Sequence, residues 1–526
     1  MHTKIVKKDI LDFLEGFSFL RVNDKTIQES LNIDGYSLWW FIKPSLVSEY
    51  VPLNRLKFEN VTSLLNENKS LFLYNFKGFF HLFFYRKMLC LSELLKILIS
   101  KKKVIGRANK KTNRILFLTH TNALKKKGSK FELDRVESLR KVVDEAKGFS
   151  SKISVAEPLS RNSLFGLRNF PNLIYSYASF KIILDAWKLS RKFSRKVKNF
   201  FRKSSFKDSD REVFKALKPL IGFFFSREYI FLTILYYKVY YEILKQEKID
   251  FLFLYSTSDI FSRCAMAASD KLDIYSGIAL HGIGFGLKRP ELPKNCLYFV
   301  PGELYKDKLE NLGVARKNIY LTGALFLSDV YNYKPVQKKQ GKVLFLTSPF
   351  IEYKVKTKEE YLELIKKMFL AFKKFEDTEF LVKSHPNERF VYEYSNIIRK
   401  LNIKNIKILS SGFQANLYDL INKTDFMISF GSTASFEALI LKKPSIIINV
   451  FGKEVEEMYQ PILQSKNVFV QLTSADKLEN VLSSALSSNS FFSNYLKEGE
   501  KFINNCLAFN DNKVNERIFE TIRKFV

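Results

Sequence analysis

Two short motifs in the second half of the chain combine the residue types that bind a phosphate group. The first spans residues 384–387 (Ser-His-Pro-Asn), and the second spans residues 429–433 (Ser-Phe-Gly-Ser-Thr). A glycine and two hydroxyl residues at a helix start offer free N–H groups, the positive end of the helix dipole and two hydroxyls to an anion. The imidazole of His385 would add a proton or a charge-assisted hydrogen bond to the same phosphate. This chemistry suits a nucleotide leaving group.

The same motifs also have a structural alternative, in which Ser432 or Thr433 caps a helix and the His-Pro pair forms a turn. Glu437 lies four residues after Thr433, on the same helical face. A carboxylate there would bind the two ribose hydroxyls, and its alternative role is compensation of the helix dipole. The residues predicted to bind the donor nucleotide and its phosphates are Lys383, His385, Pro386, Gly431, Ser432, Thr433 and Glu437.

Two polar residues at predicted strand ends in the first half are candidates for catalysis. His281 ends an apolar run at 276–281 and precedes Gly282, which places an imidazole where a general base belongs. Asp259 follows the run at 249–255 and precedes a helical segment. It would orient or deprotonate an acceptor hydroxyl, or it would cap that helix. His281 has the alternative role of a turn residue.

The pattern of apolar runs predicts the elements that position these residues. Strands and helices alternate from about residue 111, with polar residues after the strands, as in a parallel sheet with a site at its carboxyl edge. We therefore expect an α/β protein with two doubly wound Rossmann-type domains facing a cleft. The expected parts are a helical N-terminal extension (1–110), an acceptor domain (111–335) with a basic helical insertion (about 160–248), a nucleotide-donor domain (336–492) and a C-terminal helix that packs back (493–526).

Composition excludes several classes of protein. The 526 residues are too many for one core, and 46 % hydrophobic with 27 % charged residues is typical of a globular chain. The four cysteines and five histidines are scattered, so we expect reduced, buried thiols, no metal site and no cofactor besides the nucleotide-activated substrate. The sequence shows no signal-peptide pattern and no apolar run of about 18 residues. These features predict a cytoplasmic protein.

The net charge of +32 requires an anionic partner class: nucleic acid, a membrane surface or small substrates. No nucleic-acid-binding signature is present, so no nucleic-acid partner is expected. Residues 188–203 place an apolar stripe opposite a basic face, which is typical of a helix lying in a membrane interface. The alternative is a stripe that packs on its own domain. The predicted membrane contacts, on the inner face of the cytoplasmic membrane, are Leu189, Lys192, Phe193, Arg195, Lys196, Val197 and Phe200.

The order of motifs resembles a known enzyme group over roughly residues 250–450. The motifs are 279–282 (Ala-Leu-His-Gly), 382–386 (Val-Lys-Ser-His-Pro) and the segment 425–444 that ends in Lys-Pro. They resemble GT-B-fold transferases of bacterial surface polysaccharides, above all the CDP-glycerol glycerophosphotransferases and the capsule sialyl- and Kdo-transferases. The resemblance implies metal-independent transfer of a sugar or polyol-phosphate from a CMP-, CDP- or UDP-linked donor to a glycan or lipid-linked acceptor. The resemblance implies that His281 is the base and that His385, Ser432 and Thr433 bind the donor phosphates.

Two alternatives to this function remain. The non-hydrolysing UDP-N-acetylglucosamine 2-epimerases share a His-Pro motif and a phosphate turn followed by Glu. They carry two glycines and a Glu-Glu pair where this chain has Ser-Thr-Ala-Ser and Phe-Glu at 432–437. A basic, membrane-associated scaffold without turnover is the non-enzymatic alternative.

Overall fold

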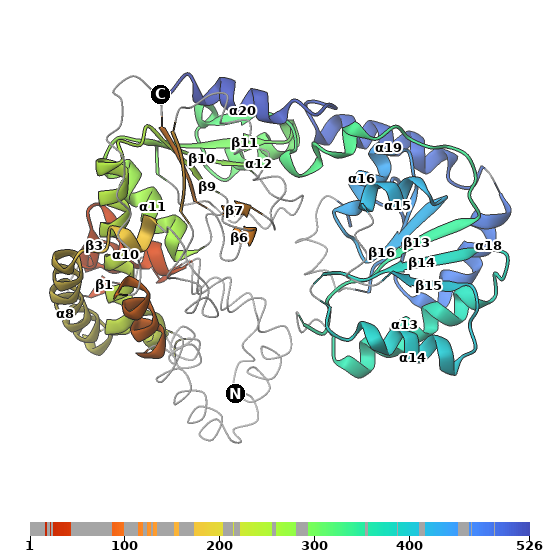
Figure 1. The fold of residues 1–526 in the computed structure, drawn as a ribbon, viewed down its shortest axis with the longest axis horizontal. Coiled ribbons are helices and arrows are strands. Elements are labelled where there is room, and N and C mark those ends of the chain that lie inside the picture. Colours follow the sequence, from red (N-terminus) through yellow and green to blue (C-terminus); the bar gives the residue numbers. More distant parts are fainter. Residues whose placement is uncertain are drawn as a thin grey trace. The chain divides into compact units, whose positions relative to one another are not determined.

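The computed structural model describes most of the chain and divides it into two compact units. The described residues are 16–17, 21–22, 25–43, 87–98, 114–118, 124–127, 130–133, 152–156, 173–203, 214, 221–254, 259–279, 293–352, 356–386, 388–409, 416–450, 462–463, 465–488 and 490–526. The first unit comprises Met1–Ala279, Glu291–Tyr298 and Phe519–Val526, and the second comprises Leu280–Pro290 and Phe299–Ile518. Figure 1 shows a layered α/β arrangement in each.

The first sheet has six strands in the order β12-β11-β10-β9-β5-β8. Pairing is parallel between β5 and β8, β5 and β9, and β9 and β10. Nearly every residue of β5, β9, β10 and β11 is buried, as in a sheet with both faces covered, and this explains their continuous apolar runs. The strands are β5 (Arg114–Leu118), β8 (Lys152–Ala156), β9 (Phe251–Leu254), β10 (Tyr275–Ala279), β11 (Cys296–Val300) and β12 (Ile319–Leu321).

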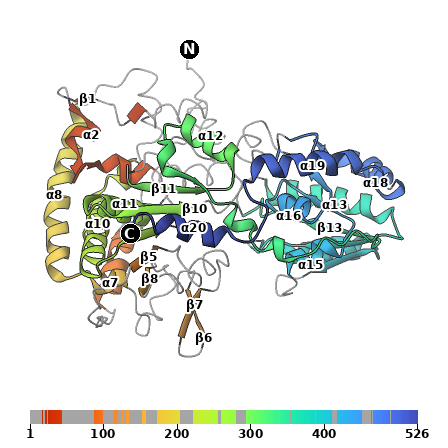
Figure 2. The ribbon, with the colours of Figure 1, turned by 90° about the horizontal axis from the view of Figure 1, so that it is seen from above.

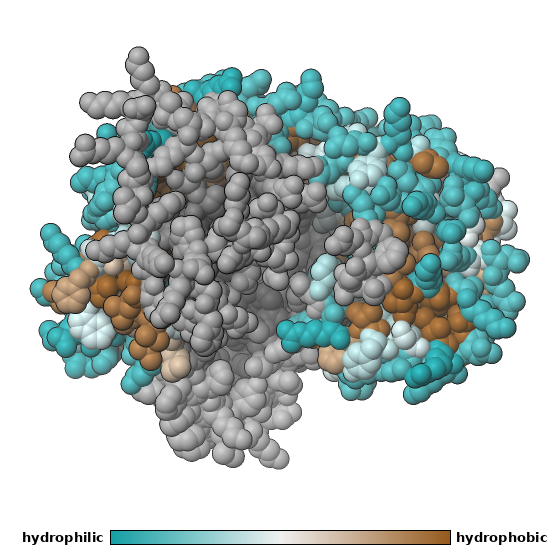
Figure 3. Space-filling view, in the orientation of Figure 1, coloured by the Kyte–Doolittle hydropathy of each residue, from teal (hydrophilic) through white to brown (hydrophobic). Residues whose placement is uncertain are grey.

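Three helices form a layer beside this sheet. Helix α10 (Arg227–Gln246), capped by Ser226, is buried along most of its length and packs against both α8 (Phe180–Lys203) and α11 (Ile260–Lys271). Figure 2 shows α8 as the outermost of the three. The short α7 (Leu173–Ser176) precedes α8. The helical insertion expected at about 160–248 is therefore present in its described residues. Figure 3 shows hydrophobic atoms at the surface where Figure 1 draws this helical layer.

The N-terminal extension is mostly helical in its described residues, and it also contains short strands. Its described residues include two antiparallel strand pairs, β1 (Arg21–Val22) with β2 (Lys25–Thr26) and β3 (Asn32–Ile33) with β4 (Tyr36–Ser37). The short helix α2 (Ile27–Ser30) and a helical segment at 87–98 accompany them. With their positive φ, Asp34 and Gly35 form a tight turn between β3 and β4 rather than continuing a helix. A further hairpin joins β6 (Leu124–Lys127) to β7 (Lys130–Leu133).

The second sheet is entirely parallel and has the order β15-β14-β13-β16-β17-β18. Numbered along the chain, this is the order 3-2-1-4-5-6 of a dinucleotide-binding fold. The two doubly wound sheets expected from the sequence are therefore confirmed. The strands are β13 (Lys342–Leu346), β14 (Glu379–Lys383), β15 (Ile406–Leu409), β16 (Phe426–Ser429), β17 (Ser445–Ile448) and β18 (Val470–Leu472).

Alternate residues of these strands feed two separate apolar cores. Val343 and Phe345 face one cluster with α13 (Lys358–Lys373), α14 (Val391–Lys400) and α18 (Leu478–Ser487). Leu344 and Leu346 face the other cluster, with α15 (Leu417–Asn422), α16 (Ala434–Ile440) and α19 (Ser493–Cys506). The period of two along β13 thus places helices on both faces of the sheet.

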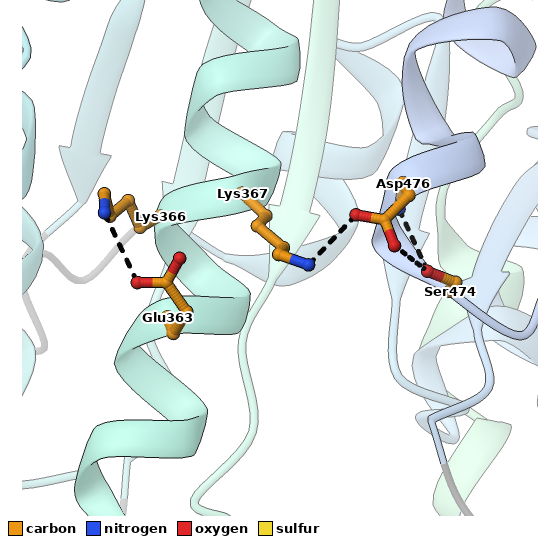
Figure 4. A network of polar contacts seen from close by, with 5 residues as sticks. All are labelled: Glu363, Lys366, Lys367, Ser474 and Asp476. Carbon is orange, nitrogen blue, oxygen red and sulfur yellow. Dashed lines mark hydrogen bonds and ion pairs between the residues drawn. The ribbon is translucent and has the colours of Figure 1, made fainter.

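Helix α13 is fixed at its start and at its flank. Thr357 and Glu360 form a capping box at its N-terminus. Lys367 pairs with Asp476 at 3.1 Å, and Asp476 also accepts a hydrogen bond from Ser474 at the start of the 3-10 turn η7 (Ala475–Lys477), as Figure 4 shows. Because this ion pair is half exposed, it contributes at most about 1 kcal/mol. It aligns η7 beside α13 more than it stabilises the fold.

The remaining elements connect the sheets and close the chain. They are α12 (Glu303–Asn311), η4 (Arg316–Asn318), η5 (Leu325–Leu327), η6 (Val330–Asn332) and α20 (Val514–Ile522). After α20, the ring of Phe525 lies 4.6 Å from that of Tyr275 on β10, so these last residues pack on the first sheet. The four cysteines are buried and unpaired. Among the described helices, none has the length and apolar character needed to cross a bilayer.

Candidate functional site

The strand order of the second sheet defines where a ligand would bind. The order reverses between β13 and β16, and ligands of such sheets bind outside the carboxyl ends of the strands at this point. The segment after β13 begins with Thr347, and the segment after β16 is the Phe-Gly-Ser-Thr turn at 430–433. The His-Pro motif follows β14, the neighbour of β13 on the other side. Both sequence motifs therefore lie at the expected edge.

The two motifs flank β13 rather than adjoin each other. Pairing of β13 with both β14 and β16 places the ends of the latter strands about 10 Å apart, since neighbouring strands lie about 4.8 Å apart. His385 and Ser432 are therefore too far apart to bind the same phosphate, in contrast to the expectation from the sequence. A diphosphate, or a phosphate with its attached sugar, fits such a span better than a single phosphate does.

A half-buried carboxylate, Glu388, organises the His-Pro motif. Its oxygens accept hydrogen bonds from the backbone N–H of His385 at 2.7 Å and from the hydroxyl of Tyr394 at 2.6 Å. Tyr361 donates to it at 3.2 Å, and the hydroxyl of Thr347 donates a further, short hydrogen bond. These donors come from the ends of β13 and β14 and from α13 and α14. Glu388 thus connects four elements around one turn.

Sequence reasoning did not single out Glu388 or its partners Thr347, Tyr361 and Tyr394. A signal was present, because Glu388 lies three residues after His385, the spacing at which a carboxylate returns to an upstream N–H group. The tyrosines lie on two different helices, Tyr394 six and Tyr361 27 residues from Glu388, and neither follows a spacing that predicts this contact.

The imidazole of His385 is half-buried and weakly basic. Burial lowers its pKa below the usual value, and the positive charge of Lys383 lowers it further, while Glu352 acts in the opposite direction. The ring is therefore neutral at pH 7 in the free protein, and it offers one N–H donor and one acceptor instead of a full positive charge. Lys383 ends β14, half-buried, and Pro386 is exposed in the following turn.

The turn after β16 requires its glycine. Gly431 has a φ of +89°, and a Cβ atom there would lie 3.0 Å from Cδ2 of Leu463. Its N–H donates to Ser429 Oγ at 3.3 Å, and the N–H of Ala434 donates to Ser432 Oγ at 3.2 Å. Ser432 therefore has the capping role that the sequence left open, and its own O–H remains a donor. Thr433 is half-buried at the helix start without a side-chain cap.

The helix that follows is short. Helix α16 contains seven residues, so its macrodipole is smaller than the sequence argument assumed. The groups that this turn offers to a ligand are mainly the Ser432 and Thr433 hydroxyls.

Glu437 lies in the first turn of α16 and is buried. Burial raises its pKa to about 7, against the effect of a hydrogen bond from Tyr418. A buried carboxyl group whose pKa is raised toward neutrality is a typical functional-site feature. It can accept from ribose hydroxyls when ionised and donate when protonated.

The two catalytic candidates of the first half have different outcomes. Asp259 caps α11: it accepts from the Ser262 N–H at 2.9 Å and from the Ser262 hydroxyl at 2.8 Å. Both carboxylate oxygens are thus engaged within its own helix, which is the capping alternative. His281 lies outside the described residues, and its role as a base stays a prediction.

The stripe predicted to contact a membrane is packed inside the first unit. Phe193, Val197 and Phe200 are buried in the layer where α8 packs on α10, and Leu189 is half-buried. This stripe is therefore wrong as a membrane-inserting surface. Its basic neighbours Lys192, Arg195 and Lys196 are exposed.

One cavity of about 780 Å³ lies at the opposite edge of the second sheet. Its lining includes Asp425 and Phe426 at the start of β16 and Lys443 and Pro444 just before β17. It is therefore distinct from the edge that carries the two motifs. Within the part of the chain that the structure describes, no three His, Cys, Asp or Glu side chains gather as metal ligands would.

The part of the chain that contains the second sheet matches the model of a known protein family. Residues 296–523 match the family model described as UDP-N-acetylglucosamine 2-epimerase. A search of curated proteins finds no relative of this chain. The match covers the whole second sheet and the last two strands of the first.

Similar solved structures include epimerases and glycosyltransferases. A UDP-GlcNAc 2-epimerase from Neisseria meningitidis bound to UDP-GlcNAc is 13 % identical, with 78 % of this chain and 100 % of that chain covered and a TM-score of 0.44. MurG from Acinetobacter baumannii is 11 % identical, with 78 % and 99 % covered and a TM-score of 0.44. A glycosyltransferase from Rickettsia africae is 14 % identical, with 79 % and 100 % covered and a TM-score of 0.42. The matching family model is thus an epimerase model, not a glycerophosphotransferase or sialyltransferase model.

Proposed function

We propose that this chain is an enzyme acting on a nucleotide-activated sugar, whose nucleotide binds at the carboxyl edge of the second sheet. The observation that carries this proposal is the family-model match across residues 296–523, which contains the complete 3-2-1-4-5-6 sheet and both motifs at its switch edge. The description of that family favours a uridine nucleotide among the CMP-, CDP- and UDP-linked donors.

Each residue at this edge has a role that its chemistry supports. The hydroxyls of Ser432 and Thr433 donate to phosphate oxygens, with Gly431 allowing the close approach of the backbone. The Glu388 network holds the turn that carries His385, about 10 Å from the turn after β16. From there the neutral ring donates a hydrogen bond to the second phosphate or to the sugar. Glu437 accepts from the ribose hydroxyls. Lys383 adds positive charge at the end of β14.

The reaction we favour is transfer of the sugar or polyol-phosphate to a glycan or lipid-linked acceptor. The bond between the transferred group and the nucleotide phosphate breaks, and a new bond forms to an acceptor oxygen whose proton passes to a base. His281 is the candidate for that base. Supporting this reaction, residues 432–437 lack the paired glycines and the Glu-Glu pair that the resemblance associates with epimerases.

Epimerisation at C2 of the sugar is the second candidate, because the matching family model describes that activity. Inverting a carbon that carries hydrogen requires a proton to leave and another to return. In D₂O an epimerase would therefore place deuterium at C2 of the nucleotide sugar without any acceptor, and proton NMR would detect it. A transferase would leave C2 protonated and would release nucleotide only when an acceptor is present.

Donor binding is tested by the thermal shift that CMP, CDP and UDP produce. Changing Ser432 and Thr433 together to alanine should abolish the shift, whereas the same change at the exposed pair Ser483 and Ser484 in α18 should preserve it. A wild-type protein that responds to none of the three nucleotides would remove the proposal. Loss of the shift in both double variants would show a general fault in folding instead.

The base is tested separately. His281→Ala should lower turnover by roughly two to four orders of magnitude while the nucleotide-induced shift persists. Near-normal turnover in this variant would exclude His281 as the base.

A further inference from the structure

The exposed face of α8 changes character along its length. Phe180, Leu184 and Trp187 recur at helical spacing and are exposed. The same face continues through Arg191 and Arg195 to Lys198 and Arg202, which are also exposed. The helix as a whole carries nine basic residues and one acidic residue. It therefore presents an apolar half and a cationic half on one outward surface, while its opposite face packs on α10.

A second exposed apolar row lies on the helical segment 87–98. Met88, Leu91, Leu95 and Leu98 follow the spacing of one helical face and point away from the buried Glu93. Glu93 accepts a hydrogen bond from Tyr175 of α7 at 3.0 Å and another, short one from Tyr236 of α10. One face of this segment is therefore fixed against the helical layer, and its other face is apolar and uncovered.

The two apolar rows flank the same end of α10. Arg227, the first residue of α10, stacks over the ring of Trp187 with its guanidinium carbon 3.7 Å from the ring centre. The next residue of α10, Glu228, acts on the segment 87–98: burial and the charge of Glu228 raise the pKa of Cys90 on that segment to about 11. Figure 3 shows hydrophobic atoms at this corner (lower left), where Figure 1 draws α8 and the neighbouring helix. We name the seven exposed apolar residues of the two rows the apolar corner.

We infer that the apolar corner and the adjoining cationic half of α8 form a docking surface for an anionic lipid bilayer. The apolar side chains, between 37 % and 79 % exposed, would enter the headgroup region, and the four basic residues of the cationic half would contact lipid phosphates. Trp187 lies at the border between the two, as tryptophan does at membrane interfaces. Charge complementarity identifies the occupant, because a partner protein with a neutral apolar groove would leave this row of cations unmatched.

This surface replaces the stripe expected from the sequence with different residues of the same helix. The buried stripe serves the contact with α10, and the membrane contact falls on the opposite face. The inference does not depend on which reaction the enzyme performs or on whether it binds a nucleotide.

The distribution of tryptophan makes the surface directly measurable. The chain has three tryptophans; Trp39 and Trp40 are buried, and Trp187 is the exposed one. Vesicles of phosphatidylglycerol and phosphatidylcholine that carry brominated acyl chains should quench the fluorescence of Trp187 and leave a constant remainder from the buried pair. Trp187→Phe should remove the quenching while sedimentation with the vesicles falls only a few-fold. Quenching that persists in this variant would overturn the inference.

Charge-reversal variants and the salt dependence of binding distinguish the contribution of the cationic half from that of the apolar corner. Changing Arg191, Arg195 and Lys198 to glutamate should weaken vesicle binding more than tenfold and abolish its salt dependence. The matched control changes three exposed lysines of the second unit, Lys400, Lys404 and Lys407, to glutamate and should keep most of the binding. An equal loss in both variants would show only a response to net charge and would overturn the inference.

The apolar corner is tested at three exposed positions. Changing Leu91, Leu98 and Phe180 to serine should weaken vesicle binding at high and low salt alike. The control changes the exposed Leu304 and Tyr392 of the second unit to serine and should keep most of the binding. Wild-type protein that ignores anionic vesicles would overturn the inference. If the first serine variant then turned a dimer into a monomer in gel filtration, the apolar corner would belong to a contact between two copies.

Discussion

The carboxylate of Glu388 accepts a hydrogen bond from the backbone N–H of His385 at 2.7 Å, three residues upstream. The position of the imidazole is therefore set by a residue that was not expected to belong to the site. Because Tyr361, Tyr394 and Thr347 donate to the same carboxylate, the turn at the end of β14 is fixed to α13, α14 and β13 at once. Rigid support of this kind is what a binding site needs.

Removal of this carboxylate should loosen the whole turn. Glu388→Ala removes the acceptor of two buried tyrosine hydroxyls and leaves the His385 N–H with only Thr347 Oγ1 at 3.3 Å. Each unsatisfied buried group costs about 1–3 kcal/mol. We expect the free energy of unfolding to fall by roughly 3 kcal/mol in a urea titration. Glu379→Gln, which breaks the half-exposed pair with Lys342, should cost less than about 1 kcal/mol. Equal costs for the two variants would show that the Glu388 network contributes no special support.

Glycine should be essential at 431 for two separable reasons. Gly431→Ala places a side chain at a φ of +89° and a Cβ atom 3.0 Å from Leu463. We expect a loss of about 2 kcal/mol in unfolding free energy and a weaker nucleotide response. Gly341→Ala has a φ of +66° and no atom within 4 Å, so it isolates the backbone cost of about 1 kcal/mol. An alanine at 431 that costs no more than one at 341 would exclude the contact with Leu463 as a cause.

Glu437 should make stability fall as the pH rises from about 4.5 to about 7. The buried carboxyl, with its pKa raised to about 7, keeps its proton in the folded protein over this range, whereas the unfolded chain releases it. The destabilisation reaches roughly 3 kcal/mol above pH 7 and is absent below pH 4. Glu437→Gln should flatten this part of the pH profile, measured by urea unfolding, while the exposed Glu376→Gln should leave it unchanged. A wild-type profile without this decline would show that Glu437 is ionised at low cost.

His385 should couple nucleotide binding to proton uptake. Its pKa is lowered in the free protein by burial and by Lys383, and a bound phosphate would raise it. Affinity for a nucleoside diphosphate should therefore increase as the pH falls from 8 to 6, beyond any change due to the phosphate itself. Calorimetry in two buffers of different ionisation enthalpy would measure the protons taken up. His385→Asn should bind more weakly and take up fewer protons; unchanged uptake would assign the protons to Glu437 or to the ligand.

Much of the second unit follows from the sequence because its strands are short, continuous apolar runs between polar segments. The strands β14 and β16 are such runs: Phe-Leu-Val at 380–382 forms the centre of β14, and Phe-Met-Ile-Ser at 426–429 is β16. The position of both motifs at the switch edge follows as well. The insertion of β13 between β14 and β16 does not, because strand order depends on packing between distant segments.

Helix α8 shows a different limit of sequence reasoning. Helical periodicity identifies two apolar rows, one through Phe193 and Val197 and one through Phe180 and Leu184, but it contains no information on which row meets α10. That choice depends on the shape of α10, which is buried over most of its length. Similarly, the partners of Glu388 lie on separate helices, and no local spacing reveals them.

The division of the chain into units has a consequence for synthesis on the ribosome. Residues 519–526 belong to the first unit, although more than 200 residues of the second unit precede them in the chain. Tyr275 on β10 therefore gains its ring contact with Phe525 only after the second unit has emerged. Residues 519–526 can join the first unit only after the second unit has been synthesised, so a chain that stops before residue 519 lacks their contribution to the stability of the first unit.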